Sequence, residues 1–310
     1  MVDLFRKELN RYFLGKREIT DNVISCFLAG GHVLLEDVPG VGKTTLARAF
    51  AGLSGLSFGR IQFTPDTLPG DVTGMNVYDM KKGEFLFRPG AVMKNVVLAD
   101  ELNRATPKTQ SALLEAMEES HITVDGVIYP LPKPFMVIAT QNPISFVGTY
   151  PLPEAQLDRF MMRLSIGYPS EEEELRIAKE YLNGMKTEDI KPVPDIGDTE
   201  ALKKAVEEVY VSDAVLSYGR AVIAATRNED IFSLGASPRA MLHLIRVSRA
   251  RAFLQGRSFV KPDDIKETAI PVLAHRLIPA RGMRLEKKSN GDILSSLLLK
   301  IPVPAGDYDG

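Results

Sequence analysis

A glycine-rich loop between an apolar run and a helical stretch constrains this 310-residue chain most strongly. The loop, residues 39–44, reads Pro-Gly-Val-Gly-Lys-Thr; it follows Val33-Leu34-Leu35 and precedes a helical stretch at residues 46–50. Glycines let backbone N–H groups close on phosphate oxygens, and the positive end of the following helix dipole points at the same charge. The order of strand, glycine loop and helix therefore predicts a phosphate-binding site at the end of a buried strand.

The residue types of the loop predict separate roles. The residues expected to surround the phosphates are Pro39, Gly40, Val41, Gly42, Lys43, Thr44 and Thr45. Lys43 is expected to reach the β- and γ-phosphates, and Thr44 to place its hydroxyl on Mg²⁺. The strict pattern G-x-x-x-x-G-K-[ST] has glycine where this chain has Asp37. A plain turn that joins a strand to a helix is the structural alternative.

A second apolar run, residues 95–99, ends in the acidic pair Asp100-Glu101. A continuous β-favouring run is typical of a strand buried on both faces of a parallel sheet, and ligands bind at the carboxyl ends of such strands. We expect Asp100 to hold the Mg²⁺ shell and Glu101 to polarise the attacking water. An acidic pair after a strand more often caps a helix, but the phosphate loop upstream favours the catalytic interpretation.

Apolar runs alternate with helical patterns along the first half of the chain. The predicted strands are residues 33–36, 58–63, 95–99, 135–139 and 162–166. This alternation predicts an α/β domain, residues 1–168, with a parallel sheet covered by helices on both faces. Two β-hairpins are expected within it, near residues 75–88 and 122–129, the second around Asp125-Gly126. After Pro169 the pattern becomes helical, which predicts a smaller all-α domain, residues 169–310.

The composition excludes several classes of protein. Hydrophobic residues make up 45% of the chain and charged residues 25%, which is ordinary globular usage. The net charge of −2 provides no general attraction to nucleic acid or to an anionic membrane. Cys26 is the only cysteine, so no intramolecular disulfide can form. The chain has no apolar stretch long enough for a membrane span and no signal-peptide pattern, so we expect a cytoplasmic protein.

Five motifs in a fixed order resemble those of the MoxR family of AAA+ ATPases. They are the Walker A loop at 39–44, the Walker B run at 96–101, Ala-Thr-Gln-Asn-Pro at 139–143, residues 152–160 and residues 235–240. The resemblance extends from about Leu14 to about Pro304, and in this family the first glycine of the loop is often replaced, as it is by Asp37. Residues 63–74 resemble the helix-2 insertion, and the Asp125-Gly126 hairpin occupies the place of the pre-sensor hairpin. The resemblance implies an AAA+ core followed by a helical lid.

The resemblance also implies roles for residues outside the two Walker motifs. Asn142 resembles sensor 1, Arg159 an arginine finger that acts on the neighbouring subunit, and Arg239 the sensor 2 of the lid. Phe13, Leu14 and Gly15 match the stretch that lines the adenine. Each has an ordinary alternative: an Asn-Pro turn for Asn142, a surface ion pair for Arg159, a first-turn helix position for Arg239, and a loop with core packing for residues 13–15.

The function implied by the resemblance is Mg²⁺-dependent ATP hydrolysis in a hexameric ring of identical subunits that remodels client proteins, often with a von Willebrand factor A domain partner. Three alternatives stay open on the sequence. A chelatase-type motor subunit shares the same AAA+ branch. A nucleic-acid translocase conflicts with the weakly acidic charge, and a regulatory GTPase conflicts with the absence of an Asn-Lys-x-Asp motif.

Overall fold

The computed structural model describes residues 2–38, 40–142, 148–182, 190–193, 199–285, 288–306 and 308. Contacts divide the chain into two compact units. The first unit contains Met1–Thr20, His32–Arg159 and Leu164–Asp198, and the second contains Asp21–Gly31, Phe160–Arg163 and Thr199–Gly310. The domain boundary at residues 168 and 169 stays a prediction.

A five-stranded parallel sheet with the strand order β2-β5-β8-β1-β9 is the framework on which the phosphate loop is built. Its strands are β1 (Val33–Glu36), β2 (Phe58–Gln62), β5 (Val96–Asp100), β8 (Met136–Gln141) and β9 (Met162–Leu164). The predicted parallel sheet is confirmed, and each observed strand starts or ends within two residues of its predicted position.

The three inner strands are buried along almost their whole length, which is why they appear in the sequence as continuous apolar runs. Their parallel pairing aligns the carboxyl ends. Gln62 lies opposite Asp100, and Glu36 lies opposite Gln141. The residues that follow β1, β5 and β8 therefore meet at one edge of the sheet.

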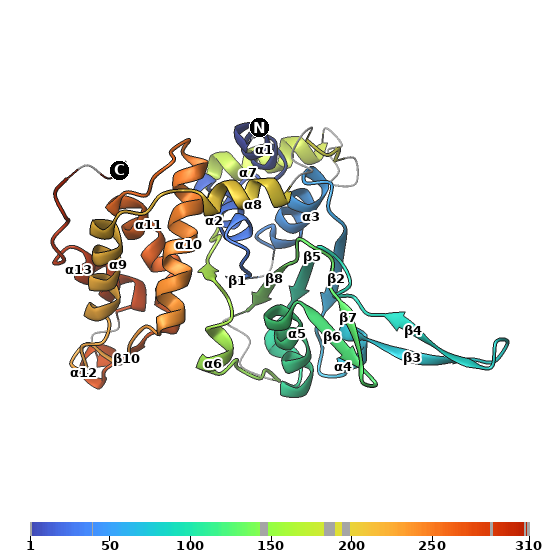
Figure 1. Ribbon diagram of the computed structural model, residues 1–310. Coiled ribbons are helices and arrows are strands. Elements are labelled where there is room, and N and C mark those ends of the chain that lie inside the picture. Colours follow the sequence, from blue (N-terminus) through green and yellow to red (C-terminus); the bar gives the residue numbers. More distant parts are fainter. Residues whose placement is uncertain are drawn as a thin grey trace. The chain divides into compact units, whose positions relative to one another are not determined.

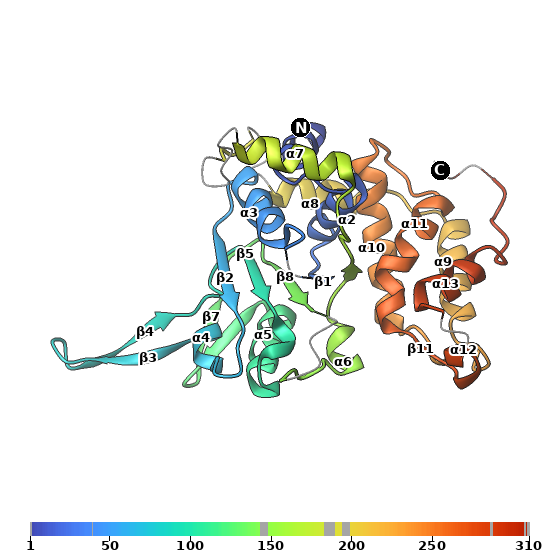
Figure 2. The ribbon, with the colours of Figure 1, turned by 180° about the vertical axis from the view of Figure 1, so that it is seen from behind.

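Helices of the first unit pack around this sheet (Figures 1 and 2). They are α1 (Val2–Tyr12), α3 (Lys43–Leu53), α4 (Pro69–Thr73), α5 (Pro107–Glu119), α6 (Glu154–Leu157), α7 (Glu171–Leu182) and the 3-10 turn η1 (Leu102–Arg104). Helix α3 contacts β2 and β5, and α1 lies on α3, where the rings of Phe5 and Phe50 meet edge to face at 5.5 Å. This packing fixes the start of α3 beside the strand ends.

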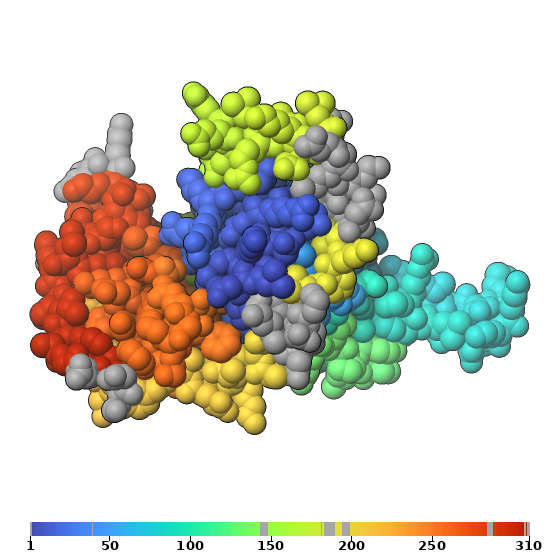
Figure 3. Space-filling model, turned by 90° about the horizontal axis from the view of Figure 1, so that it is seen from above, coloured from blue at the N-terminus to red at the C-terminus, as the bar shows by residue number. Residues whose placement is uncertain are grey.

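Two antiparallel hairpins form at the positions expected from the sequence. They are β3 (Gly74–Asp79) with β4 (Glu84–Pro89), and β6 (His121–Val124) with β7 (Val127–Pro130). Asp125 and Gly126 have φ of 49° and 81°, as a two-residue hairpin turn requires. The β3–β4 hairpin extends away from the sheet (Figures 1 and 3). Its base is attached to the other hairpin by the stacked rings of Phe87 and Tyr129, 3.9 Å apart.

The second unit is helical, and the predicted helical lid region is confirmed. Its helices are most of α2 (Arg17–Leu28), α8 (Thr199–Glu207), α9 (Asp213–Ala225), α10 (Pro238–Leu254), α11 (Pro262–Leu273), the 3-10 turn η3 (Ala274–Arg276), α12 (Arg281–Leu285) and α13 (Asn290–Leu298). The sequence did not predict the antiparallel pair of β10 (Phe232–Leu234) and β11 (Ile278–Pro279). Strands of two or three residues are too short to produce a periodic pattern. In the described part of the chain, no helix is both long enough and apolar enough to span a bilayer.

Candidate nucleotide site

The phosphate loop has the backbone that its glycines permit. Gly40 and Gly42 have φ of 90° and 89°, a region that residues with side chains rarely adopt. Gly42 immediately precedes α3, which begins at Lys43, so the positive end of the helix dipole faces the loop. Pro39 lies outside the described residues. The loop and the helix start therefore occupy the places that the sequence predicts.

The amine of Lys43 is directed back into the loop. Its Nζ donates a hydrogen bond to the backbone oxygen of Asp37 at 2.9 Å. Burial lowers the pKa of Lys43, and nearby carboxylates, of which Asp100 acts most strongly, oppose that shift. The amine thus lies next to acidic groups, and it can exchange its hydrogen bond to a backbone oxygen for one to a more negative ligand.

The carboxylate of Asp100 is oriented from both sides at the end of β5. The hydroxyl of Thr140 donates to Oδ1 at 2.7 Å, and the Arg60 guanidinium donates to Oδ2 at 2.7 Å. Sequence reasoning missed both partners. Thr140 lies inside the motif at residues 139–143, which was a usable signal, whereas Arg60 can be identified only from the pairing of β2 with β5.

Glu101 has a strained backbone, with φ of 58° and ψ of 45°. Such a conformation costs a residue other than glycine about 1 kcal/mol or more, and it is concentrated at functional sites. Its N–H donates to the Thr140 hydroxyl at 2.8 Å, and its Oε2 accepts from Arg104 at 3.0 Å and from Gln62 at 3.2 Å. The Thr140 hydroxyl therefore joins the two acidic residues, because it donates to one and accepts from the other.

A cavity of about 430 Å³ brings together the loop, the acidic pair and Asn142. We call it the strand-end cavity. Its lining residues are Gly40, Gly42, Lys43, Thr44, Thr45, Arg60, Gln62, Asp100, Glu101 and Asn142. The Thr44 hydroxyl and the Asp100 carboxylate are hard oxygen donors of the kind that Mg²⁺ prefers, so this donor set fits the predicted metal. Positive donors and carboxylates converge here as phosphoryl transfer requires.

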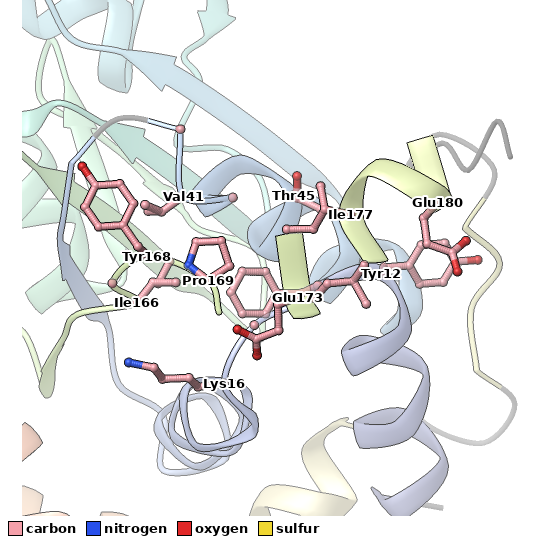
Figure 4. Close-up of a pocket in the computed structure, with 16 residues that line it drawn as sticks. Tyr12, Lys16, Val41, Thr45, Ile166, Tyr168, Pro169, Glu173, Ile177 and Glu180 are labelled. Atoms are coloured by element: carbon pink, nitrogen blue, oxygen red, sulfur yellow. The ribbon is translucent and has the colours of Figure 1, made fainter. Parts of the chain in front are cut away.

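A second cavity of about 670 Å³ also lies at the phosphate loop (Figure 4). We call it the base cavity. Gly40, Gly42 and Thr45 line both cavities, so the two adjoin at the loop. The remaining wall residues are Tyr12, Phe13, Leu14, Gly15, Lys16, Val41, Ile166, Gly167, Tyr168, Pro169, Glu173, Ile177 and Glu180. All three residues expected near the adenine are among them, and a cavity of this size with both apolar and polar walls suits a nucleoside.

The walls of the base cavity come from separate segments of the first unit. In the view of Figure 4, Val41, Ile166, Tyr168 and Pro169 group on one side, and Ile177 of α7 lies on another. The sequence did not single out residues 166–169 or α7 as part of a site. They reach the cavity only because β9 lies beside β1 in the sheet.

The two predicted arginines lie at different places. Arg159 forms an ion pair with Glu118 at 3.0 Å, and the two side chains are 32% and 33% exposed. Arg159 does not line either of the two cavities. The ion pair matches the alternative left open on the sequence, and an action on a neighbouring subunit stays a prediction. Arg239 is exposed in the first turn of α10, whose N-cap Ser237 accepts from the N–H of Ala240 at 3.2 Å. The N-cap is as predicted, and the sensor-2 role stays a prediction.

Comparisons with known proteins agree with this geometry. Residues 32–162 match the ATPase family associated with various cellular activities (AAA), and residues 224–297 match the AAA lid domain. YeaC of Bacillus subtilis is 46% identical over 96% of this chain and 93% of its own length. Chaperone MoxR1 of Mycobacterium tuberculosis is 40% identical over 96% of this chain and 81% of its own length. A crystal structure of a protein from Cytophaga hutchinsonii superimposes with a TM-score of 0.91 at 36% identity, covering 98% of this chain and 95% of that one. The chain belongs to the MoxR family of AAA ATPases.

Proposed function

We propose that this protein hydrolyses Mg²⁺-bound ATP in the cytoplasm. It works as a hexameric ring of identical subunits that remodels client proteins. A von Willebrand factor A domain protein is a candidate partner. The observation that carries the proposal is the gathering of Lys43, Asp100, Glu101 and Asn142 around one cavity beside the phosphate loop. The 40% identity to a relative named as a chaperone supports the client-remodelling part.

Binding uses the two adjoining cavities together. The triphosphate lies on the loop and the start of α3, where backbone N–H groups and the helix dipole attract it. Lys43 exchanges its hydrogen bond to the Asp37 carbonyl for one to the phosphates. The adenine lies in the base cavity beside Phe13 and Leu14.

Catalysis of ATP hydrolysis depends mostly on positioning the reacting groups and on stabilising the charge of the transition state. Thr44 and Asp100 would hold Mg²⁺, which, when bound, neutralises charge on the phosphate oxygens. Thr140 and Arg60 keep the Asp100 carboxylate in place for that role.

Four further side chains complete the reaction geometry. Glu101 polarises the attacking water, and Asn142 orients it. Arg159 of an adjacent copy contributes positive charge from outside the chain, and Arg239 contributes from the lid. An isolated subunit should therefore be a poor ATPase.

The direct test is the isosteric substitution Glu101→Gln. It removes the base but keeps size and hydrogen bonding, so turnover should fall about 10²- to 10⁴-fold while Mg·ATP affinity stays within about threefold. Steady-state phosphate release and calorimetry measure the two quantities. Glu115→Gln, on the exposed side of α5, is the matched control and should behave as wild type. Wild-type turnover in Glu101→Gln would remove Glu101 from the mechanism.

A further inference from the structure

Asp37 occupies the position where the strict phosphate-loop pattern has glycine. Its backbone does not need glycine, because Asp37 lies outside the positive-φ region that Gly40 and Gly42 occupy. Its side chain is buried, with 5% of the residue exposed. A buried carboxylate is costly unless hydrogen-bond donors surround it, so its partners indicate what it does.

Both carboxylate oxygens of Asp37 are bonded to one segment far along the chain. Oδ2 accepts from the N–H of Ile166 at 2.6 Å, and Oδ1 accepts from the N–H of Gly167 and the hydroxyl of Ser165, each at 3.0 Å. Hydrogen bonds to an ionised acceptor are roughly twice as strong as neutral ones. Three of them from consecutive residues hold the segment 165–167 firmly beside the end of β1.

The anchored segment continues directly into a wall of the base cavity. Ile166, Gly167, Tyr168 and Pro169 all line it, together with the loop glycines Gly40 and Gly42. The backbone oxygen of Asp37 also holds the Lys43 amine. One residue thus attaches the wall of the base cavity through its side chain and contacts the phosphate-binding lysine through its backbone.

We propose that Asp37 is a positioning residue for nucleotide recognition. It fixes segment 165–167 against the phosphate loop, so that the base cavity is formed before the ligand arrives. The preference for a nucleoside triphosphate over a bare triphosphate then depends on Asp37. This inference rests on the proposed ATP site.

Two substitutions at Asp37 disturb the wall of the base cavity without changing the phosphate-binding residues of the loop. In Asp37→Asn, the amide NH₂ must face at least one of the backbone N–H donors of Ile166 and Gly167, which places donor against donor. In Asp37→Gly, the chain regains the strict loop pattern but loses every acceptor for segment 165–167. Both changes leave the loop glycines, Lys43 and Thr44 in place.

Calorimetry on the full chain with two probes, Mg·ATP and Mg·tripolyphosphate, tests the proposal. Asp37→Asn and Asp37→Gly should each weaken ATP binding about tenfold, while tripolyphosphate affinity stays within about twofold. Ser165→Ala removes one of the three donors and should weaken ATP binding about two- to threefold, again without affecting tripolyphosphate.

The control is Asp264→Asn, another buried carboxylate, which binds Arg257 and the N–H of Lys261 in the second unit. It should lower the melting temperature and leave the ratio of the two affinities unchanged. Equal losses for both probes in the Asp37 variants, or no loss for ATP, would overturn the inference. If the Asp37 variants do not fold, the ratio of the affinities for Mg·ATP and Mg·tripolyphosphate in Ser165→Ala tests the inference instead. Wild-type protein that binds neither probe would instead refute the proposed ATP site itself.

Discussion

The ion pairs of the strand-end cavity in the first unit differ from a buried ion pair in the second unit. In the first unit, Arg60 pairs with Asp100 and Arg104 pairs with Glu101, and both arginines are more than two-fifths exposed, at 42% and 48%. In the second unit, the side chains of Arg257 and Asp264 are 18% and 3% exposed and form a two-pronged pair.

The buried Arg276 extends this contrast. It donates to the backbone oxygens of Phe160 and Val272 and contacts His275 and His243. An ion pair whose arginine is exposed to solvent contributes about 0–1 kcal/mol, so a ligand can replace the arginine at little cost. Breaking a buried pair costs about 3–5 kcal/mol because one charge is left without its partner. The first arrangement suits a site that exchanges partners, and the second suits a scaffold.

The largest expected effect comes from Arg159→Ala in the first unit. If Arg159 is an arginine finger, its removal should lower oligomer-dependent turnover about 10³-fold or more. Loss of the partly exposed pair with Glu118 should change the free energy of unfolding by less than about 1 kcal/mol. ATPase assays and urea denaturation measure the two quantities, and ATP affinity should survive.

Mixing experiments sharpen this prediction. Lys43→Ala subunits should lack the phosphate contact but retain Arg159, so adding them to Arg159→Ala subunits should restore part of the activity. No recovery at any mixing ratio would argue against action across a subunit interface.

Asp264→Ala in the second unit should lower stability and leave turnover nearly unchanged, which is the reverse of the effect expected for Arg159→Ala. It leaves the Arg257 guanidinium without its carboxylate, so the free energy of unfolding should fall by about 3 kcal/mol. Turnover per folded molecule should stay within about twofold of wild type. Urea denaturation and ATPase assays normalised to folded protein test both parts. An intact stability, or a turnover loss comparable to that of Arg159→Ala, would contradict the contrast between the units.

The smallest expected effect is a pH dependence from His275. Burial, reinforced by the Arg276 charge, holds the pKa of His275 well below its usual 6.5. Below about pH 6.5, His275 therefore binds a proton in the unfolded chain but not in the folded chain. The free energy of unfolding consequently falls as the pH is lowered, by at most about 1.4 kcal/mol per pH unit from this group. His275→Gln cannot titrate and should have a correspondingly shallower dependence between pH 6.5 and 5. Equal slopes in the two proteins would contradict the prediction.

The fold was largely predictable because its signals are local. The runs at 33–36 and 95–99 are apolar throughout since both faces of their strands are buried, and the turn at Asp125-Gly126 reflects backbone preferences of two residues. The β10–β11 pair was missed because it is too short for any periodicity.

The candidate site was predictable in part. Lys43, Asp100, Glu101 and Asn142 belong to motifs, and they line one cavity. Arg60 was missed because nothing near it in the sequence indicates that its partner is Asp100. Their hydrogen bond joins residues 40 positions apart, and it follows from the pairing of β2 with β5.

The amino-acid sequence by itself determined the strands of the parallel sheet, the two longer hairpins, the phosphate loop and the acidic pair, because each depends on residues close together in the chain. Only the tertiary structure decided what surrounds them. The bonds from Asp37 to residues 165–167 span 128 to 130 positions. Such contacts depend on which strands become neighbours in the sheet, and a sequence pattern carries no direct record of that choice.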